Sequence, residues 1–312
     1  MSGLPFLDAA AVAALSPLEA VDALEAALRA GLDPDADPPR QAVGTEAGEI
    51  LIMPSASRGA AGVKLVTVAP GNPDRGLPRI QGVYVLFDPA TLAPAALVDG
   101  IALTNLRTAA VSALAVRHLV TPSAPAPRRL LVFGTGAQGW AHVGALRAVA
   151  PDLDRVDVVA RDRARRDAFV ARCAREHGLD ARAASPAAAR DADLIVCATT
   201  SREPLFDGAL VRAGATVVAI GSHEPAAREV DETLAGAATV VVESRGSALR
   251  EAGDVIAAID AGVLDPDALV PLAALVRGDA AAAPGRPRLF KSTGMAWEDL
   301  VVAAAVHARA TG

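Results

Sequence analysis

Aromatic side chains are scarce in this 312-residue sequence, where phenylalanine, tryptophan and tyrosine together make up 3% of the residues. Proteins that hold single-stranded nucleic acid stack its bases on exposed aromatic rings, and this chain has little material for such a surface. The formal net charge of −6 also disfavours phosphate backbones and acidic membrane surfaces as partners. We therefore expect no nucleic-acid partner and no membrane partner.

Cysteine is equally scarce, with only Cys173 and Cys197 present. Their spacing is not that of metal ligands, and two cysteines cannot form a disulfide framework in a chain of this length. Two reduced, buried thiols and no metal site are the expectation. The sequence also lacks an apolar run of about 20 residues and a basic leader, which argues against a membrane span and a signal peptide. A soluble, cytoplasmic protein is expected.

The order of strands and helices changes along the chain. The first part begins with a helix over residues 16–32, capped by Ser16, and continues with short strands separated by glycine, proline and asparagine turns. Closely spaced strands of this kind are typical of an antiparallel or mixed sheet. From Arg128 onward, continuous apolar strands alternate with helices, which predicts a parallel sheet covered on both faces.

These patterns predict an α/β protein of two domains. A Rossmann-type parallel-sheet domain over residues 123–289 is expected to bind a dinucleotide. It is inserted into a mixed α+β domain for substrate binding and dimerisation, formed by residues 1–122 and by residues 290–312, which read as a short strand, a turn and a helix. The proline-rich segment 121–127 is the expected linker.

The segment LLVFGTGAQGWAHV, residues 130–143, places the pattern G-x-G-x-x-G between an apolar strand and a helix. In such loops the first glycine makes the turn, the second lets the backbone approach a pyrophosphate, and the third allows close helix–strand packing. The helix N-terminus adds free amides and the positive end of a dipole. A tight turn that binds nothing is the plainer alternative. The expected cofactor-binding residues are Gly134, Thr135, Gly136, Ala137, Gln138 and Gly139.

The end of the next strand bears on the choice between NAD and NADP. NAD sites usually place a carboxylate there to hold the ribose 2′-hydroxyl, whereas here the strand is followed by Arg161, which could face a 2′-phosphate. Asp162 could accept from a ribose hydroxyl, although its expected role is to cap the following helix. The sequence favours NADP(H) and leaves NAD(H) open.

Five segments, taken in chain order, together match the sequence motifs of one protein family. They are GVKLVTVAPGNPDRGLPRIQG, LTNLRTAAVSALA, FGTGAQG, VVAIGSHEPAAREVD and FKSTGMAWEDL. Together they resemble the ornithine cyclodeaminase/mu-crystallin family, nearly from end to end. The resemblance implies a homodimer with a substrate domain built from both chain ends. Its members include cyclodeaminases, amino-acid dehydrogenases, ketimine reductases and binding proteins, so the reaction stays open.

Three cations resemble the family's carboxylate-binding set, namely Arg40, Lys64 and Arg107. An arginine binds the carboxylate of a 2-amino or 2-imino acid at two points and so holds the α-carbon for hydride transfer. Lys64 lies on an apolar strand, where burial could lower its pKa and make it a proton donor. Alternatively, Arg107 could be a helix residue paired with an acid, Lys64 could extend from an edge strand to solvent, and Arg40 could be an ordinary loop residue.

The block GSHEP departs from the family pattern. Members that deaminate ornithine have an aspartate, assigned as the catalytic acid–base, where this chain has His223. A reductase of an already cyclic imine needs only a bound iminium, a hydride and a proton donor, and histidine can give a proton near neutrality. Its position after an apolar strand is where α/β proteins bind ligands. Glu224 could be the acid–base residue or hold His223, and His223 could be a loop histidine satisfied locally.

Further cofactor contacts are expected at the ends of other strands. Thr199 and Thr200 follow the fourth strand of the parallel sheet, where the nicotinamide ribose should lie, although small hydroxyls also form turns. Gly221 opens the GSHEP block. Thr293 lies in a segment that resembles the family's segment beside the nicotinamide, and it could instead cap the last helix. Arg79 stands where cyclodeaminases have a threonine, and no role is assigned to it.

The function expected from the sequence is NAD(P)H-dependent reduction of cyclic ketimine carboxylates. Δ1-pyrroline-2-carboxylate would give proline, and Δ1-piperideine-2-carboxylate would give pipecolate. The three cations would hold the carboxylate, and His223 or Lys64 would supply the proton. Alternatives are an ornithine cyclodeaminase, an NAD(P)-dependent amino-acid dehydrogenase and, as a different class, a cofactor-containing binding protein with little turnover.

Overall fold

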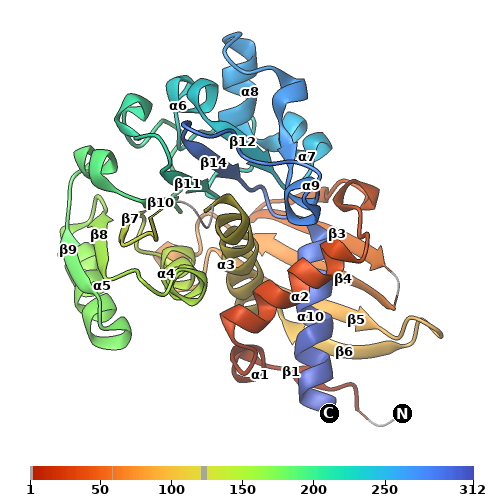
Figure 1. Ribbon diagram of the computed structural model, residues 1–312. Helices are drawn as coiled ribbons and strands as arrows, with labels where there is room; N and C mark the ends of the chain where they lie inside the picture. The colour runs from red at the N-terminus through yellow and green to blue at the C-terminus, as the bar shows by residue number, and fades with distance from the viewer. Residues whose placement is uncertain (1–2, 58, 121–124) are drawn as a thin grey trace. The chain divides into compact units, whose positions relative to one another are not determined.

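The computed structural model divides into two compact units, which are drawn in Figure 1. Unit 1 comprises Met1–Val111 and Met295–Gly312, and unit 2 comprises Ser112–Gly294. The structure describes residues 3–57, 59–120 and 125–312. Positions 121–124 of the expected linker therefore lie outside the described residues. The assignment of substrate binding to one unit and dinucleotide binding to the other remains a prediction.

Unit 1 is built on a six-stranded sheet with the order β1-β6-β5-β4-β3-β2, in which β1 pairs with β6 in parallel and the other neighbours are antiparallel. Its strands are β1 (Phe6–Leu7), β2 (Gln41–Thr45), β3 (Gly48–Ser57), β4 (Ala60–Val68), β5 (Ile80–Phe87) and β6 (Pro94–Asp99). The helices are α1 (Ala9–Ala13), α2 (Pro17–Arg29), the start of α3 (Gly100–Leu119) and α10 (Ala296–Thr311), with short 3-10 turns η1 (Pro34–Ala36) and η2 (Pro73–Arg75). The antiparallel and mixed pairing confirms the sheet expected from the sequence.

Helix α10 covers one face of this sheet and also contacts α2. Its first residue, Ala296, packs with Leu51, Met53 and Val66 from the sheet. Helix α2 begins where the sequence predicts, because Ser16 and Glu19 form a reciprocal capping box and a proline fits the first turn. The sheet face under α10 therefore carries the core of unit 1, and the polar side chains of Ser55, Lys64 and Tyr84 are buried there.

Unit 2 is built on an eight-stranded sheet in which all pairs are parallel, in the order β13-β12-β14-β11-β10-β7-β8-β9. Its strands are β7 (Arg129–Phe133), β8 (Arg155–Val159), β9 (Asp180–Ala183), β10 (Leu194–Cys197), β11 (Thr216–Ala219), β12 (Thr239–Val242), β13 (Val270–Pro271) and β14 (Arg288–Lys291). The helices are α4 (Ala137–Val149), α5 (Arg163–His177), α6 (Glu232–Ala237), α7 (Arg245–Glu251), α8 (Gly253–Asp260) and α9 (Leu272–Arg277), with η3 (Pro186–Asp191), η4 (Gly208–Leu210) and η5 (Pro266–Ala268).

This sheet confirms the Rossmann-type α/β class. The chain runs outward from β7 through β8 to β9 on one side, and β10 pairs with β7 on the other side. The carboxyl end of β7 is thus the switch point of the topology, which is where open α/β sheets bind ligands. Cys173 and Cys197 are both buried, as expected of thiols in such a core.

Strand β14 lies elsewhere than the sequence suggested. The short strand before the last helix was expected in the first domain, but β14 pairs in parallel with β11 and β12 inside the sheet of unit 2. All four of its residues are buried, as are those of β11 and β12. A central position follows, because a strand that is buried on both faces fits a parallel sheet that has helices on both sides. Among the helices in the described ranges, none is long and apolar enough to cross a membrane.

Candidate functional site

The glycine-rich loop lies between the end of β7 and the start of α4. Gly134 has a φ of +102°, and a Cβ there would lie 2.3 Å from the carbonyl oxygen of Ala198. At Gly139 a Cβ would lie 2.2 Å from the carbonyl oxygen of Gly134, whereas at Gly136 it would meet nothing within 4 Å. Gly134 and Gly139 are therefore needed for close packing. Gly136 leaves open space before the first amides of α4. This is the geometry that accommodates a pyrophosphate.

The segment after β8 carries the candidate for recognition of the adenosine ribose. Asp162 caps helix α5, since its Oδ1 accepts a hydrogen bond from the amide of Arg165 at 3.1 Å. This confirms the capping role expected for Asp162. Arg161, the residue before it, is exposed and lies two positions past the last residue of β8. The chain therefore presents an exposed guanidinium, rather than an uncommitted carboxylate, next to the switch-point strand.

Thr199 and Gly221 are both held by one carboxylate, that of Glu229. The amide and the hydroxyl of Thr199 each donate to Glu229 Oε1 at 2.7 Å, and the Gly221 amide donates to Oε2 at 2.6 Å. A Cβ at Gly221 would lie 2.1 Å from the carbonyl oxygen of Thr199, so only glycine fits between the two loops. Thr200 is exposed beside them.

His223 is half-buried and follows β11 after the buried Ser222. Its neighbour Glu224 is exposed, and its carboxylate forms an ion pair of 2.9 Å with Arg202, both side chains being more than half accessible. Glu224 is thus engaged in a surface ion pair, and its role as an acid–base residue remains a prediction, as does that of His223.

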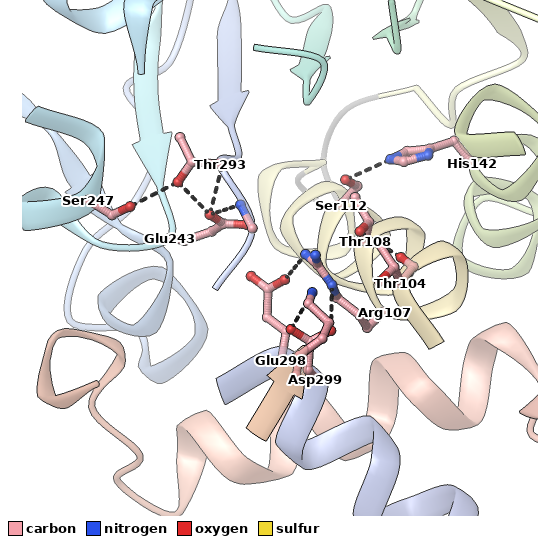
Figure 2. A network of polar contacts seen from close by, with 12 residues as sticks. Thr104, Arg107, Thr108, Ser112, His142, Glu243, Ser247, Thr293, Glu298 and Asp299 are labelled. Carbon is pink, nitrogen blue, oxygen red and sulfur yellow. Dashed lines mark hydrogen bonds and ion pairs between the residues drawn. The ribbon is translucent and has the colours of Figure 1, made fainter. Parts of the chain in front are cut away.

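Thr293 lies in a turn that is organised by Glu243. Glu243 Oε2 accepts from the amides of Thr293 and Gly294 at 2.9 and 3.0 Å, and the Thr293 hydroxyl is 3.0 Å from that of Ser247 (Figure 2). Glu243 is itself buried at the end of β12. Helix α10 has Met295 as its N-cap residue, so the side chain of Thr293 serves this turn rather than the helix.

In unit 1, two of the three predicted cations are brought together by α10. Lys64 Nζ lies 2.7 Å from Asp299 Oδ2, and Arg107 Nε lies 3.1 Å from Asp299 Oδ1. Arg107 Nη1 is also 2.7 Å from Glu298 Oε2 (Figure 2). We call these four residues, Lys64, Arg107, Glu298 and Asp299, the buried ionic cluster, because none of their side chains is more than 7% exposed.

Lys64 is fixed in a setting that eases loss of its proton. Burial lowers the pKa of Lys64 from 10.5 to about 8, and the adjacent Arg107 guanidinium acts in the same direction. Asp299 and Glu298 oppose this shift by stabilising the ammonium form. The pKa of about 8 places the ammonium close to the working range of a general acid at neutral pH. Lys64 does not extend to solvent, so that alternative is wrong.

A second buried polar group lies next to Lys64 on the sheet. Tyr84 is directly opposite Lys64 in the pairing of β4 with β5 and is fully buried. Its hydroxyl lies over Gly62, where a Cβ would be 2.3 Å away, so a glycine is required there. Burial raises the pKa of Tyr84, which keeps the phenol protonated, and burial also raises the pKa of Asp37 to about 6.

Arg40 and Arg79 are the remaining cations named from the sequence. Arg40 is half-buried and directly precedes β2, and Arg79 is exposed before β5. A place for Arg40 beside the substrate carboxylate remains a prediction.

The sequence reasoning missed the acidic side chains that organise both units. Glu298 and Asp299 were part of a quoted motif, yet no role was given to them. Their signal was their position, since two consecutive carboxylates in an otherwise apolar helix cannot both face solvent when the helix is a central one. Glu229 and Glu243 were also given no role, and both are buried. Buried acids require partners.

Comparison with known proteins identifies the family. The sequence matches the model of the ornithine cyclodeaminase/mu-crystallin family over residues 7–312. The chain belongs to this family, as its motifs suggested. It is 36% identical over 307 residues to Δ1-pyrroline-2-carboxylate reductase 2 of Burkholderia ambifaria, a match that covers 96% of this chain and 94% of the relative.

Solved structures agree with this assignment. Δ1-pyrroline-2-carboxylate reductase of Thermococcus litoralis, in complex with NADH and L-proline, matches with a TM-score of 0.90 and 28% identity, covering 98% of this chain and 97% of the other. An archaeal alanine dehydrogenase dimer with bound NAD matches with a TM-score of 0.88 and 28% identity, covering 98% and 96%.

Proposed function

We propose that this protein is an oxidoreductase that uses a nicotinamide cofactor to reduce cyclic ketimine carboxylates. Δ1-pyrroline-2-carboxylate would give proline, and its six-membered homologue would give pipecolate. The observation that carries the proposal is the buried ionic cluster, in which an arginine and a lysine with a pKa of about 8 lie on the same carboxylate. The relatives named for this reaction, one of them bound to NADH and L-proline, support the substrate class.

The cofactor is proposed to bind unit 2. The glycine-rich loop at the switch point offers the first amides of α4 to the pyrophosphate. The loop residues Gly134, Thr135, Gly136, Ala137, Gln138 and Gly139 would surround it. Thr199, Thr200, Gly221 and Thr293 follow strands that end at the same edge of the sheet, where the nicotinamide half is expected.

We propose NADPH as the preferred form of the cofactor. Arg161 is exposed at the position where NAD-binding proteins usually place a carboxylate, and Asp162 is committed to capping α5. A guanidinium binds a 2′-phosphate at two points. NADH would then be a slower substrate, because it offers no phosphate to Arg161.

The substrate carboxylate is proposed to bind the cations of unit 1. Arg107 and Lys64 bring two positive charges to Asp299, and Arg40 would add a third on the substrate side. Hydride from the nicotinamide goes to the imine carbon while the imine nitrogen carries one proton. The overall reaction consumes one imine, one NADPH and one proton, and yields one cyclic amino acid and NADP+.

The proton is proposed to come from Lys64, whose lowered pKa suits a donor that must be charged before the reaction and neutral after it. Solvent would then restore the ammonium. His223 is the rival donor, and the two are separated by their variants. In a His223→Asn variant the reduction should persist if Lys64 is the donor and should be lost if His223 is.

A homodimer is proposed from the second face of the sheet in unit 1. Ile52, Leu65 and Val83 lie opposite one another across β3, β4 and β5, on the face that points away from α10. They are apolar, and Leu65 is 37% exposed. An apolar sheet face is commonly covered by a second copy in obligate dimers. The alanine dehydrogenase relative is a dimer. A cytoplasmic location stays a prediction from the sequence.

An amino-acid dehydrogenase is the second candidate, because the alanine dehydrogenase covers nearly the whole chain. Such an enzyme would join ammonia to a 2-oxo acid, so ammonium separates the two functions. The assay follows NADPH oxidation with Δ1-pyrroline-2-carboxylate or Δ1-piperideine-2-carboxylate, and then with pyruvate and ammonium. Oxidation with the cyclic imines alone supports the proposal. Oxidation only with ammonium and a 2-oxo acid would identify an amino-acid dehydrogenase instead of a ketimine reductase. Ammonia release from ornithine with NAD+ would identify an ornithine cyclodeaminase.

A further inference from the structure

A second ionic group is buried in unit 2 and has no part in the function proposed above. It consists of Glu229, Asp254 and Lys291, which are 0%, 1% and 1% exposed. Lys291 Nζ forms an ion pair of 2.8 Å with Asp254 Oδ2, and Asp254 Oδ1 accepts from the amides of Glu229 and Val230 at 2.6 and 2.9 Å. We call these three residues the carboxylate–lysine triad.

The triad joins the ends of three neighbouring strands. β10, β11 and β14 are adjacent in the sheet. Glu229 holds the amide and hydroxyl of Thr199 after β10 and the amide of Gly221 after β11. Lys291, the last residue of β14, donates to the carbonyl oxygen of Ser222 at 2.7 Å. The loops that follow β10 and β11 are therefore tied to the triad by their backbone, and β14 supplies the lysine.

Stability alone does not explain such a group. A buried ion pair gains little over well-packed apolar side chains, because removing both charges from water costs about as much as their attraction returns. The triad contains two carboxyl groups and one amine, and burial raises the pKa of Glu229, which shows that its charged form is costly in this core. What the charged groups provide, and apolar ones cannot, is a set of directed bonds to backbone atoms at fixed positions.

We infer that Glu229, Asp254 and Lys291 are positioning residues, which set the loops carrying Thr199 and His223 at the geometry needed for cofactor binding and for turnover. Glu229 acts through Thr199 and Gly221, and Lys291 acts through Ser222, the residue before His223. This rests on the proposed function for its catalytic part, while the part concerning cofactor binding stands by itself.

The first test uses Lys291→Met alone and combined with Asp254→Asn. The single variant leaves both carboxylates without a countercharge, so its melting temperature should fall. In the double variant an asparagine oxygen still accepts from the Glu229 and Val230 amides, so much of the melting temperature should return. Because methionine cannot donate to Ser222, kcat for imine reduction should stay at least about tenfold below wild type in both. Recovery of kcat together with the melting temperature would overturn the inference.

The second test separates cofactor binding from turnover and does not depend on Lys291 variants folding. Glu229→Gln keeps one acceptor for Thr199, but its amide group faces the Gly221 amide and cannot accept from it. The Kd for NADPH, measured by its fluorescence, should rise about tenfold. An unchanged Kd would overturn the inference. If wild type binds NADPH but reduces no cyclic imine, the proposed function fails and this binding test still decides the triad.

The matched control is Asp157→Asn. Asp157 is also a buried carboxylate of unit 2, 1% exposed, and it pairs with Arg129 and Arg155 at 2.5 and 3.0 Å. Through these bonds it contacts neither the loop after β10 nor the loop after β11. The variant should lose melting temperature, while the Kd for NADPH and kcat stay within about twofold of wild type. Equal losses of kcat in Asp157→Asn and Lys291→Met would show that any buried charge in this unit matters, and would refute a specific positioning role.

Discussion

Each unit of this protein buries one lysine against one aspartate, and the two pairs differ in what surrounds them. Lys64 in unit 1 lies 2.7 Å from Asp299, which also holds the guanidinium of Arg107. Lys291 in unit 2 lies 2.8 Å from Asp254, whose other oxygen accepts from backbone amides, and Lys291 itself donates to a backbone carbonyl. The ammonium of Lys64 therefore has the guanidinium of Arg107 beside it, whereas the ammonium of Lys291 has backbone groups beside it.

On the basis of this difference we propose that Lys64 takes part in the reaction and that Lys291 positions backbone groups. A neighbouring cation destabilises an ammonium, and together with burial it brings the pKa of Lys64 down to about 8. This lowered pKa is the reason why Lys64 is proposed as the proton donor. The peptide partners of Lys291 fix the ends of strands instead. The two lysine–aspartate pairs therefore differ in their other contacts, which are ionic in unit 1 and are made with the backbone in unit 2.

The largest expected effect is on Lys64. Lys64→Met should lower kcat for cyclic-imine reduction by about a thousandfold, in the range found when a general acid is removed. Lys64→Arg is the matched variant, because it keeps the positive charge but does not release a proton at neutral pH. It should keep the KM for the imine within a few fold and still lose kcat. Steady-state kinetics decides this. Retention of kcat in Lys64→Arg would make Lys64 a carboxylate ligand only.

The next largest effect is expected when the aspartate of either lysine–aspartate pair is replaced by asparagine. Asp299→Asn removes the carboxylate that pairs with both Lys64 and Arg107 while these two cations stay buried. The variant should therefore lose about 3–5 kcal/mol of unfolding free energy. It also removes an influence that raises the pKa of Lys64. Reduction needs the ammonium, so kcat should fall in wild type as the pH rises through about 8, and this limb should move to lower pH in Asp299→Asn. In Asp254→Asn the limb should not move. Equal shifts in both variants would show that Asp299 has no specific effect on the proton donor.

His142 is a buried base whose ring nitrogens lie 2.8 Å from the carbonyl oxygen of Gln138 and 2.9 Å from the hydroxyl of Ser112. Burial lowers the pKa of His142 from 6.5 to about 4. Between these pH values the unfolded chain binds more protons than the folded one, so stability is lost as the pH falls from 6.5 toward 4, by about 3 kcal/mol. Urea unfolding of wild type and His142→Gln at pH 6.5 and 4.5 measures it. A variant with the same pH dependence as wild type would contradict this assignment.

The smallest expected effect concerns an exposed charge. Arg161→Ser should raise the KM for NADPH about tenfold, which corresponds to loss of one charge-assisted contact to phosphate, and should leave the KM for NADH within about twofold. Arg163→Ser is the matched control on the same exposed segment. A similar loss with both cofactors, or no loss with NADPH, would contradict the proposed 2′-phosphate contact.

The sequence predicted the parts of this protein whose structure is set locally. The glycine pattern, the cap at Asp162 and the apolar strands of the parallel sheet depend on residues a few positions apart. Strand β14 was placed with the wrong neighbours, because a strand of four residues, of which only Leu289 and Phe290 are apolar, does not specify which strands it pairs with. The contacts of Arg107 with Glu298 and Asp299 join positions 191 and 192 residues apart, and those of Glu229 and Lys291 are also long-range. Periodicity carries no information about such pairs, although the two consecutive carboxylates Glu298 and Asp299 in an otherwise apolar helix could have indicated one of them.

The proposed reaction is tested most directly by following the hydride itself. NADPH carrying deuterium at both hydrogens of the nicotinamide C4 is mixed with the protein and Δ1-pyrroline-2-carboxylate, and the proline formed is examined by mass spectrometry and NMR. We predict proline with one deuterium, located at C2. Proline without deuterium, or no proline while NADPH remains bound and unoxidised, would contradict the assignment of this protein as a ketimine reductase.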